Sequence, residues 1–176
     1  MFYKIAFFVL LVAVLAVIII FGPRIRKDIQ LKKEKTGVFA IQNVQTERCL
    51  RPYNAGFLDG TPVILYEHKD WECVTWHLIA LGNNTYLLEN LYTEKTFEPE
   101  SEPAENVAVR QRPLGESHGQ RWQLLKQDDG TFLIRLKDTE WYLTAENDEQ
   151  NSPVVLRHLQ ESKAQKWRLI PQNPII

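Results

Sequence analysis

The residues whose chemistry could serve catalysis or metal binding are few in this chain and lie far apart. Those nearest to a zinc-ligand set are two cysteines and two histidines, Cys49, His68, Cys73 and His77. They include no Cys-x-x-Cys pair, and His77 directly follows Trp76, which we expect to be core. We therefore expect no metal ion and no cofactor.

The sequence also lacks the motifs that place a nucleophile, a general base or a phosphate-binding backbone. It has no Gly-x-Gly, no phosphate-binding loop, no Gly-x-Ser-x-Gly and no His-Glu-x-x-His. Four glutamates and two prolines lie within residues 98–105, a composition typical of an acidic surface loop rather than a calcium site. We predict that the protein is not an enzyme and has no catalytic residues.

The charge of the chain is divided between two unlike parts. The formal net charge is only −1, but residues 24–35 hold six basic and two acidic side chains. Residues 36–176 hold 14 basic and 20 acidic side chains. A nucleic-acid-binding domain has the opposite balance, so we expect no nucleic-acid partner.

An apolar segment precedes the basic cluster. Residues 5–21 contain no polar side chain, and a helix of this length, at about 1.5 Å per residue, just crosses a bilayer core of roughly 30 Å. A cleaved signal peptide is the alternative, but the run ends in bulky residues before Gly22-Pro23, where cleavage is disfavoured. We predict a single transmembrane helix within residues 1–23 that contacts the lipid bilayer through residues 5–21.

The basic residues that flank this segment predict its orientation. Lys4 precedes the apolar run, whereas six lysines and arginines follow it within residues 24–36. Basic residues are retained on the cytoplasmic side, so the domain that follows is predicted to face the cytosol. An extracytoplasmic location is the alternative, because short N-terminal tails with one lysine also occur on anchors that export their C-terminal domain. We interpret residues 24–36 as a solvated basic linker.

From Gly37 onward the chain repeats itself three times. Three stretches begin with an aromatic residue, carry Thr-Glu at the same offset and end in Leu or Phe; they start at Phe39, Tyr86 and Phe132. Each is followed by a short apolar strand, ending at Tyr66, Arg110 and Arg157. Each unit closes with a tryptophan strand, containing Trp76, Trp122 and Trp167.

This repeat predicts an all-β domain of twelve strands in three units of four. One four-stranded unit cannot bury its apolar face alone, whereas closure of three units buries a shared core and removes most exposed strand edges.

Residues 37–171 resemble the ricin B-type β-trefoil lectin family. The resemblance is carried by Gln120-Arg121-Trp122 and Gln165-Lys166-Trp167, which match the family's Gln-x-Trp motif, while the first unit has Val74-Thr75-Trp76. The resemblance implies a six-stranded barrel capped by three hairpins, here spanning residues 37–173. It also implies that Trp76, Trp122 and Trp167 fill the core together with the aliphatic residues of the strands. Gln120 and Gln165 are expected to brace the fold.

In this family each unit can hold a shallow sugar pocket made of an acidic residue, an aromatic platform and polar groups before the tryptophan strand. The first unit carries at these positions Arg51, Tyr66, Cys73 and Val74. The second unit carries Glu98, Arg110, Gly119 and Gln120. The third unit carries Thr144, Arg157, Ala164 and Gln165. No unit keeps the full set, and a sugar needs several directed hydrogen bonds.

We therefore expect a membrane-anchored, non-catalytic binding module whose ligand is a carbohydrate. The alternative is a protein-interaction module with degenerate sugar pockets, whose acidic surface binds a membrane protein. A trefoil protease inhibitor that uses loop 53–61 is a third possibility. The sequence leaves open whether Cys49 and Cys73 pair, since the resemblance implies a partner for Cys49 near His68.

Overall fold

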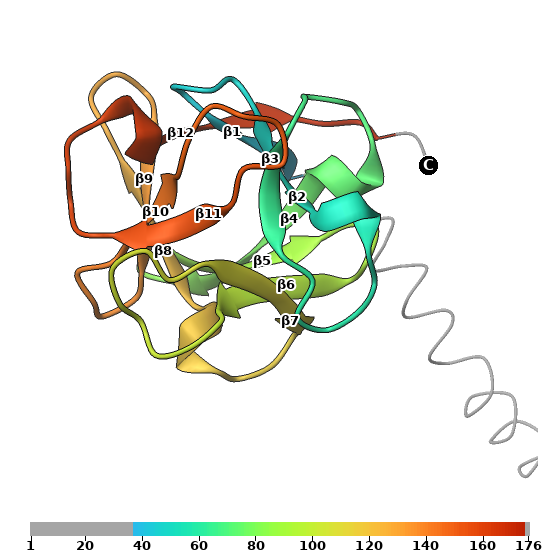
Figure 1. Cartoon of the computed structure of the whole chain (residues 1–176), viewed down its shortest axis with the longest axis horizontal. Coiled ribbons are helices and arrows are strands. Elements are labelled where there is room, and N and C mark those ends of the chain that lie inside the picture. The colour runs from blue at the N-terminus through green and yellow to red at the C-terminus, as the bar shows by residue number, and fades with distance from the viewer. Residues whose placement is uncertain (1–36, 175–176) are drawn as a thin grey trace, which may run out of the picture. The chain divides into compact units, whose positions relative to one another are not determined.

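Six strands close into a barrel in the computed structural model, which describes residues 37–174 (Figure 1). They are β1 (Val38–Asn43), β4 (Thr75–Gly82), β5 (Thr85–Asn90), β8 (Trp122–Lys126), β9 (Phe132–Leu136) and β12 (Lys166–Pro171). Each pairs antiparallel with its two neighbours in this order, and β12 pairs with β1 to complete the ring. The first and last strands of the domain therefore lie side by side.

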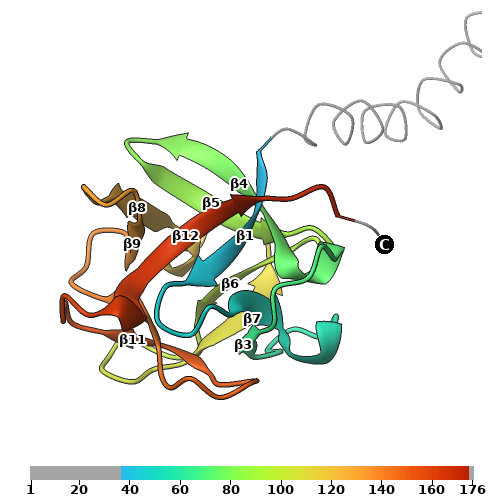
Figure 2. The same ribbon diagram turned by 90° about the horizontal axis from the view of Figure 1, so that it is seen from above.

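Three hairpins cover one end of the barrel. They are β2 (Cys49–Pro52) with β3 (Val63–Tyr66), β6 (Lys95–Pro99) with β7 (Val109–Pro113), and β10 (Tyr142–Ala145) with β11 (Val154–Arg157). Figure 2 shows β3, β7 and β11 gathered at the end of the domain away from the start of β1. Within residues 37–174 the structure thus has the twelve strands and the barrel-and-hairpin arrangement that the repeat and the family resemblance predict.

Four 3-10 turns connect these strands. Turn η1 (Tyr53–Ala55) follows β2. The other three lie just before the tryptophan strand of each unit: η2 (Glu72–Val74), η3 (His118–Gln120) and η4 (Lys163–Gln165). The residues before the tryptophans are thereby held next to the hairpins, with η2 against β2, η3 against β6 and η4 against β10.

The three tryptophans occupy equivalent positions in the core and are fully buried. Each indole N–H donates to a backbone carbonyl of the hairpin in its own unit, at Leu50 (2.9 Å), Phe97 (3.3 Å) and Leu143 (3.1 Å). Burial removes a large apolar surface from water, and the hydrogen bond satisfies the only polar atom of the ring. Each tryptophan therefore ties one wall of the barrel to the hairpin above it.

Residues 37–174 contain no helix with the length and hydropathy needed to cross a membrane. The predicted transmembrane helix at residues 1–23 and the predicted linker at residues 24–36 lie outside the described residues.

Candidate ligand-binding pockets

The strand register defines which residues of the three hairpins are equivalent. In each hairpin a buried apolar residue of the first strand lies opposite a buried residue of the second, in the pairs Leu50–Leu65, Phe97–Gln111 and Leu143–Leu156. Three isolated bridges repeat with the same threefold pattern, at Pro62–Arg110, Ala108–Val155 and Pro153–Ile64. The equivalence therefore rests on two independent sets of backbone pairs.

This register corrects one predicted site residue. The residue after Gln111 is Arg112, so Arg112, and not Arg110, stands where the other units have Tyr66 and Arg157. The repeat predicts that the apolar strand of the second unit ends at Arg110, which is two residues too early, because Val109 and not Val107 is the residue buried in the core. A strand that alternates apolar and polar residues aligns equally well after a shift of two. Arg110 instead pairs with Glu100 and donates to the carbonyl of Gly60 at 3.3 Å.

In the first unit, Arg51 lies over Tyr66. The guanidinium carbon is 4.1 Å from the centroid of the Tyr66 ring, a cation–π contact that covers one face of the predicted aromatic platform. The Nε atom of Arg51 is buried and has no hydrogen-bond partner. Burial raises the pKa of the nearby Cys73 thiol, and the positive charge of Arg51 opposes that rise.

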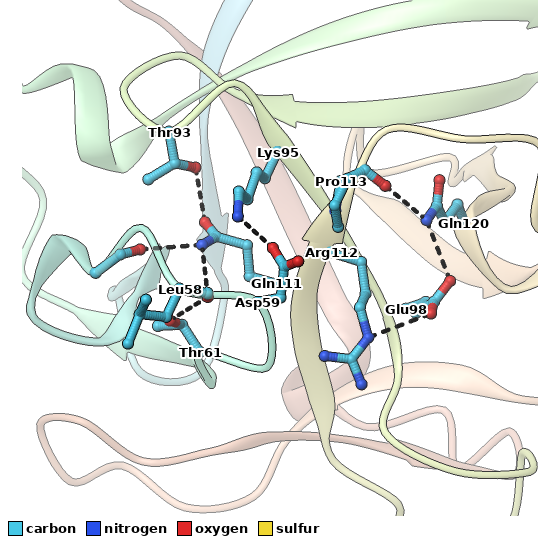
Figure 3. A network of polar contacts seen from close by, with 11 residues as sticks. Leu58, Asp59, Thr61, Thr93, Lys95, Glu98, Gln111, Arg112, Pro113 and Gln120 are labelled. Atoms are coloured by element: carbon cyan, nitrogen blue, oxygen red, sulfur yellow. Dashed lines mark hydrogen bonds and ion pairs between the residues drawn. The ribbon is translucent and has the colours of Figure 1, made fainter.

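In the second unit, Glu98 is held by two neighbours (Figure 3). One carboxylate oxygen lies 3.5 Å from Nε of Arg112, and the other accepts a hydrogen bond of 3.2 Å from Nε2 of Gln120. Gln120 is itself fixed, because it donates to the carbonyl of Pro113 (3.0 Å) and accepts from the amide of Gly115 (2.9 Å). The side chains of Glu98 and Arg112 remain 22% and 33% exposed, so a hydrogen-bond acceptor and a donor lie together at the surface.

In the third unit, the predicted site residues are occupied by internal contacts. Thr144 is fully buried, and its hydroxyl accepts from Nε2 of Gln165 at 3.0 Å and donates to the carbonyl of Tyr142 at 3.0 Å. Nε of Arg157 donates to the Asn106 side chain at 2.9 Å. The hydroxyl of Thr144 thus faces the protein interior rather than solvent.

Gln165 and Gln120 make the same backbone contacts in their units. Gln165 accepts from the amide of Gln160 at 2.7 Å and donates to the carbonyl of His158 at 2.8 Å, as Gln120 does with residues at the same offsets. Val74 stands at this position in the first unit and makes no such bonds. Two residues of this unit instead contact the C-terminal residues of the domain. Asp70 accepts a hydrogen bond from the backbone N–H of Asn173, and Nε2 of His68 lies 2.8 Å from Nε2 of Gln172.

Sequence reasoning missed the role of Gln111, which fixes loop 53–61. Gln111 is fully buried where the other units have leucine. Its amide donates to the carbonyl of Gly56 at 3.0 Å and accepts from the hydroxyl of Thr93 at 2.6 Å (Figure 3). An ion pair between Asp59 and Lys95 adds a second link from the loop to the second unit. Gln111 stands where the alternation of the strand predicts a buried apolar residue. Because the residues on both sides of it are arginines, the sequence shows three polar residues in a row and the alternation is lost.

This fixed loop presents apolar side chains to solvent. Tyr53, Phe57 and Leu58 are 44%, 52% and 79% exposed, and Tyr92 of the second unit is 39% exposed. The rings of Phe57 and Tyr92 are in contact, with centroids 4.7 Å apart. We call these four residues the loop patch.

Cys49 and Cys73 are both free thiols. Burial raises the pKa of Cys49 from 9.0 to about 12, so its reactive thiolate is scarce at neutral pH. Packing in the same small apolar cluster, with Ala40 and Val74, accounts for both cysteines without a disulfide.

No protein-family model matches the sequence, and no curated protein matches it. Solved structures do match. A designed threefold-symmetric protein, ThreeFoil, has a TM-score of 0.73 at 23% identity, over 76% of this chain and 98% of that one. The Rhizoctonia solani agglutinin has a TM-score of 0.69 at 22% identity, over 76% of this chain and 94% of that one.

A third match is the Macrolepiota procera ricin B-like lectin, solved in complex with lactose. Its TM-score is 0.65 at 16% identity, over 76% of this chain and 94% of that one. At these identities the matches show a shared fold. Residues 37–174 therefore have the β-trefoil fold found in ricin B-like lectins.

Proposed function

We propose that the trefoil is a non-catalytic, lectin-like module that binds carbohydrate, tethered to a membrane through residues 5–21. The observation that carries the proposal is the second unit, where Glu98 and Arg112 lie side by side at the surface and Gln120 orients the carboxylate. A carboxylate accepts hydrogen bonds from sugar hydroxyls, and a guanidinium donates to their oxygens. The lectins among the structural matches support a carbohydrate as the ligand class.

The second unit is the best candidate of the three because its polar groups are both oriented and accessible. In the first unit Arg51 covers one face of Tyr66, and in the third Thr144 is buried. A preorganised pair loses little conformational entropy when a ligand binds, which is what a shallow pocket needs. Neutral saccharides with neighbouring hydroxyls are the ligands that fit this pair.

Replacing Glu98 with glutamine is expected to weaken binding of a neutral saccharide by about tenfold or more. The change removes the charge from an acceptor, and hydrogen bonds to a charged group contribute about 1.5–3 kcal/mol. The measurement is a glycan array with the purified full-length chain, followed by calorimetric titration of the best neutral ligand. Glu102→Gln, an exposed glutamate in the same acidic loop, is the matched control and should bind like the unchanged protein. An array without neutral ligands, or equal affinities for Glu98→Gln and Glu102→Gln, would contradict the proposal.

The loop patch favours a second candidate function, a protein-interaction module. Exposed aromatic residues on a loop held rigidly from beneath are typical of contact surfaces between proteins. The discriminating variant is Leu58→Asp, which places a charge at the most exposed apolar position. Two results together would favour this second candidate. The chain would cross-link to one defined membrane protein and lose this cross-link in Leu58→Asp, and the glycan array would show no ligand.

The proposed tether predicts a side of the membrane that protease protection can test. Six basic residues follow residues 5–21 and one precedes them, so we expect the trefoil on the cytosolic side. Protease added to intact cells should leave the trefoil whole, and protease added after permeabilisation should cleave exposed loops. A cytosolic marker protein and a surface marker protein serve as controls. Degradation of the trefoil in intact cells would overturn the cytosolic orientation and place the domain among extracytoplasmic polysaccharides.

A further inference from the structure

Arg51 differs from the other arginines of the three hairpins because it has no carboxylate partner. Arg110 pairs with Glu100, Arg112 with Glu98, and Arg157 with Glu105. Within the described part of the chain, no ion pair links Arg51 to an acidic side chain. Its Nε atom is also buried without a hydrogen-bond partner, so no acceptor in the described residues satisfies this nitrogen.

Tyr66 holds the guanidinium of Arg51 in place without satisfying its hydrogen bonds. Stacking on the ring at 4.1 Å restricts the plane of the group, while the N–H donors of arginine point outward within that plane. An acceptor that approaches in the plane therefore meets a preorganised, charged donor. At the equivalent position the second unit has an acid, Glu98, so the first unit reverses the charge of this pocket.

Trp71 adds an exposed aromatic ring to the same unit. It directly precedes turn η2, which contacts β2, the strand that carries Arg51. The residues that precede the corresponding turns of the other units are serines, Ser117 and Ser162. Trp71 is 39% exposed, whereas Tyr66 has one face covered by Arg51.

We propose that the first unit binds an acidic saccharide, with a sugar carboxylate on Arg51 and the sugar ring against Trp71. A planar carboxylate accepts two parallel hydrogen bonds from a guanidinium, a geometry that the planar fork of arginine favours. Residues 36–176 have more acidic than basic side chains, so a general attraction for polyanions does not explain such binding. The inference rests on the proposed carbohydrate-binding function but assigns a different unit and a different ligand class from the Glu98 pocket.

The test compares a trigalacturonic acid with its methyl ester, which keeps the rings and removes the charge. Calorimetric titration of the full-length chain should show the acid binding at least tenfold more tightly than the ester. Arg51→Gln should abolish that difference, and Arg51→Lys should restore only part of it, because lysine keeps the charge and loses the fork. Arg168→Gln removes the same charge from an exposed position on β12 and is the matched control.

Trp71→Ala separates stacking from charge recognition. It should weaken binding of the acid and of the ester by similar factors and leave their ratio unchanged. A thermal melt of each variant checks that the domain is folded. Equal affinities for acid and ester, or an acid preference that survives Arg51→Gln, would overturn the assignment of this unit. If the neutral-sugar array is positive while the acid fails to bind, only this inference falls; if both are negative, the proposed carbohydrate function falls as well.

Discussion

Replacing Trp122 with alanine is expected to lower the free energy of unfolding by about 3–5 kcal/mol, the range for a large aromatic residue removed from a core. Trp122 is fully buried, and its ring centroid lies 5.1 Å from that of Phe97. The truncation also leaves the carbonyl of Phe97 without the indole donor that lies 3.3 Å from it. The lost contacts, the cavity and the unpaired carbonyl all act in the same direction.

Urea unfolding of the full-length chain, followed by near-ultraviolet circular dichroism, measures this effect. The free energy of unfolding of Trp122→Phe should lie between those of the alanine variant and the unchanged protein, since phenylalanine keeps a buried ring but loses the hydrogen bond. Trp71→Ala is the comparison variant, because Trp71 is 39% exposed and its truncation should cost clearly less than that of the fully buried Trp122. A Trp122→Ala protein as stable as Trp71→Ala would contradict the threefold core described above.

Gln165→Leu is expected to cost about 2–4 kcal/mol, although it places an apolar residue in a buried position. The backbone amide of Gln160 and the carbonyl of His158 lose their side-chain partner, and the hydroxyl of Thr144 loses one of its two hydrogen bonds while it still donates to the carbonyl of Tyr142. A buried polar group left unpaired costs about 1–3 kcal/mol, and partial access of water reduces the sum.

The same urea experiment tests this variant. Gln160→Leu is the control, because only the backbone N–H of Gln160 contacts Gln165 and its side chain is exposed. This change should leave the free energy of unfolding nearly unchanged. Thr144→Val in the Gln165→Leu background should cost less than Thr144→Val alone, because the hydrogen bond between Thr144 and Gln165 is already gone. Additive costs for the two changes would show that these side chains are not coupled.

The fold was predictable because its main determinants repeat. Tryptophans 46 and 45 residues apart report the length of one four-stranded unit, and each fills the same place in the core. Local turns were less predictable. Thr-Glu recurs at the same offset, but Glu47 (φ 57°) and Glu94 (φ 55°) adopt the left-handed conformation in two turns, and Asp138 (φ 59°) does so in the third. Turns of different geometry can join equivalent strands, so a shared dipeptide does not define a shared turn.

The sequence predicted which residue types lie in the candidate sites, but not the strand register or the side-chain conformations that bring them together. Glu98 lies at the register position that the repeat predicts for it, but the arginine that pairs with it lies two residues from the predicted one, since alternation alone cannot fix the register of β7. The contact of Arg51 with Tyr66 was not predictable either. The two residues lie on paired strands and meet only through the side-chain conformation that Arg51 adopts.

The three units share one backbone plan but present unlike side chains at equivalent positions: Arg51 and Tyr66, then Glu98 and Arg112, then buried Thr144 with Arg157. A ligand whose chemistry suits one pocket finds no second copy of that pocket on the same domain. Under the proposed carbohydrate-binding function, each chain is therefore monovalent for a given ligand, and a polymer of identical units gains no avidity from the threefold symmetry. With the proposed membrane tether, multivalent attachment requires several chains in the same membrane, so its strength follows their lateral density rather than the number of repeats in each.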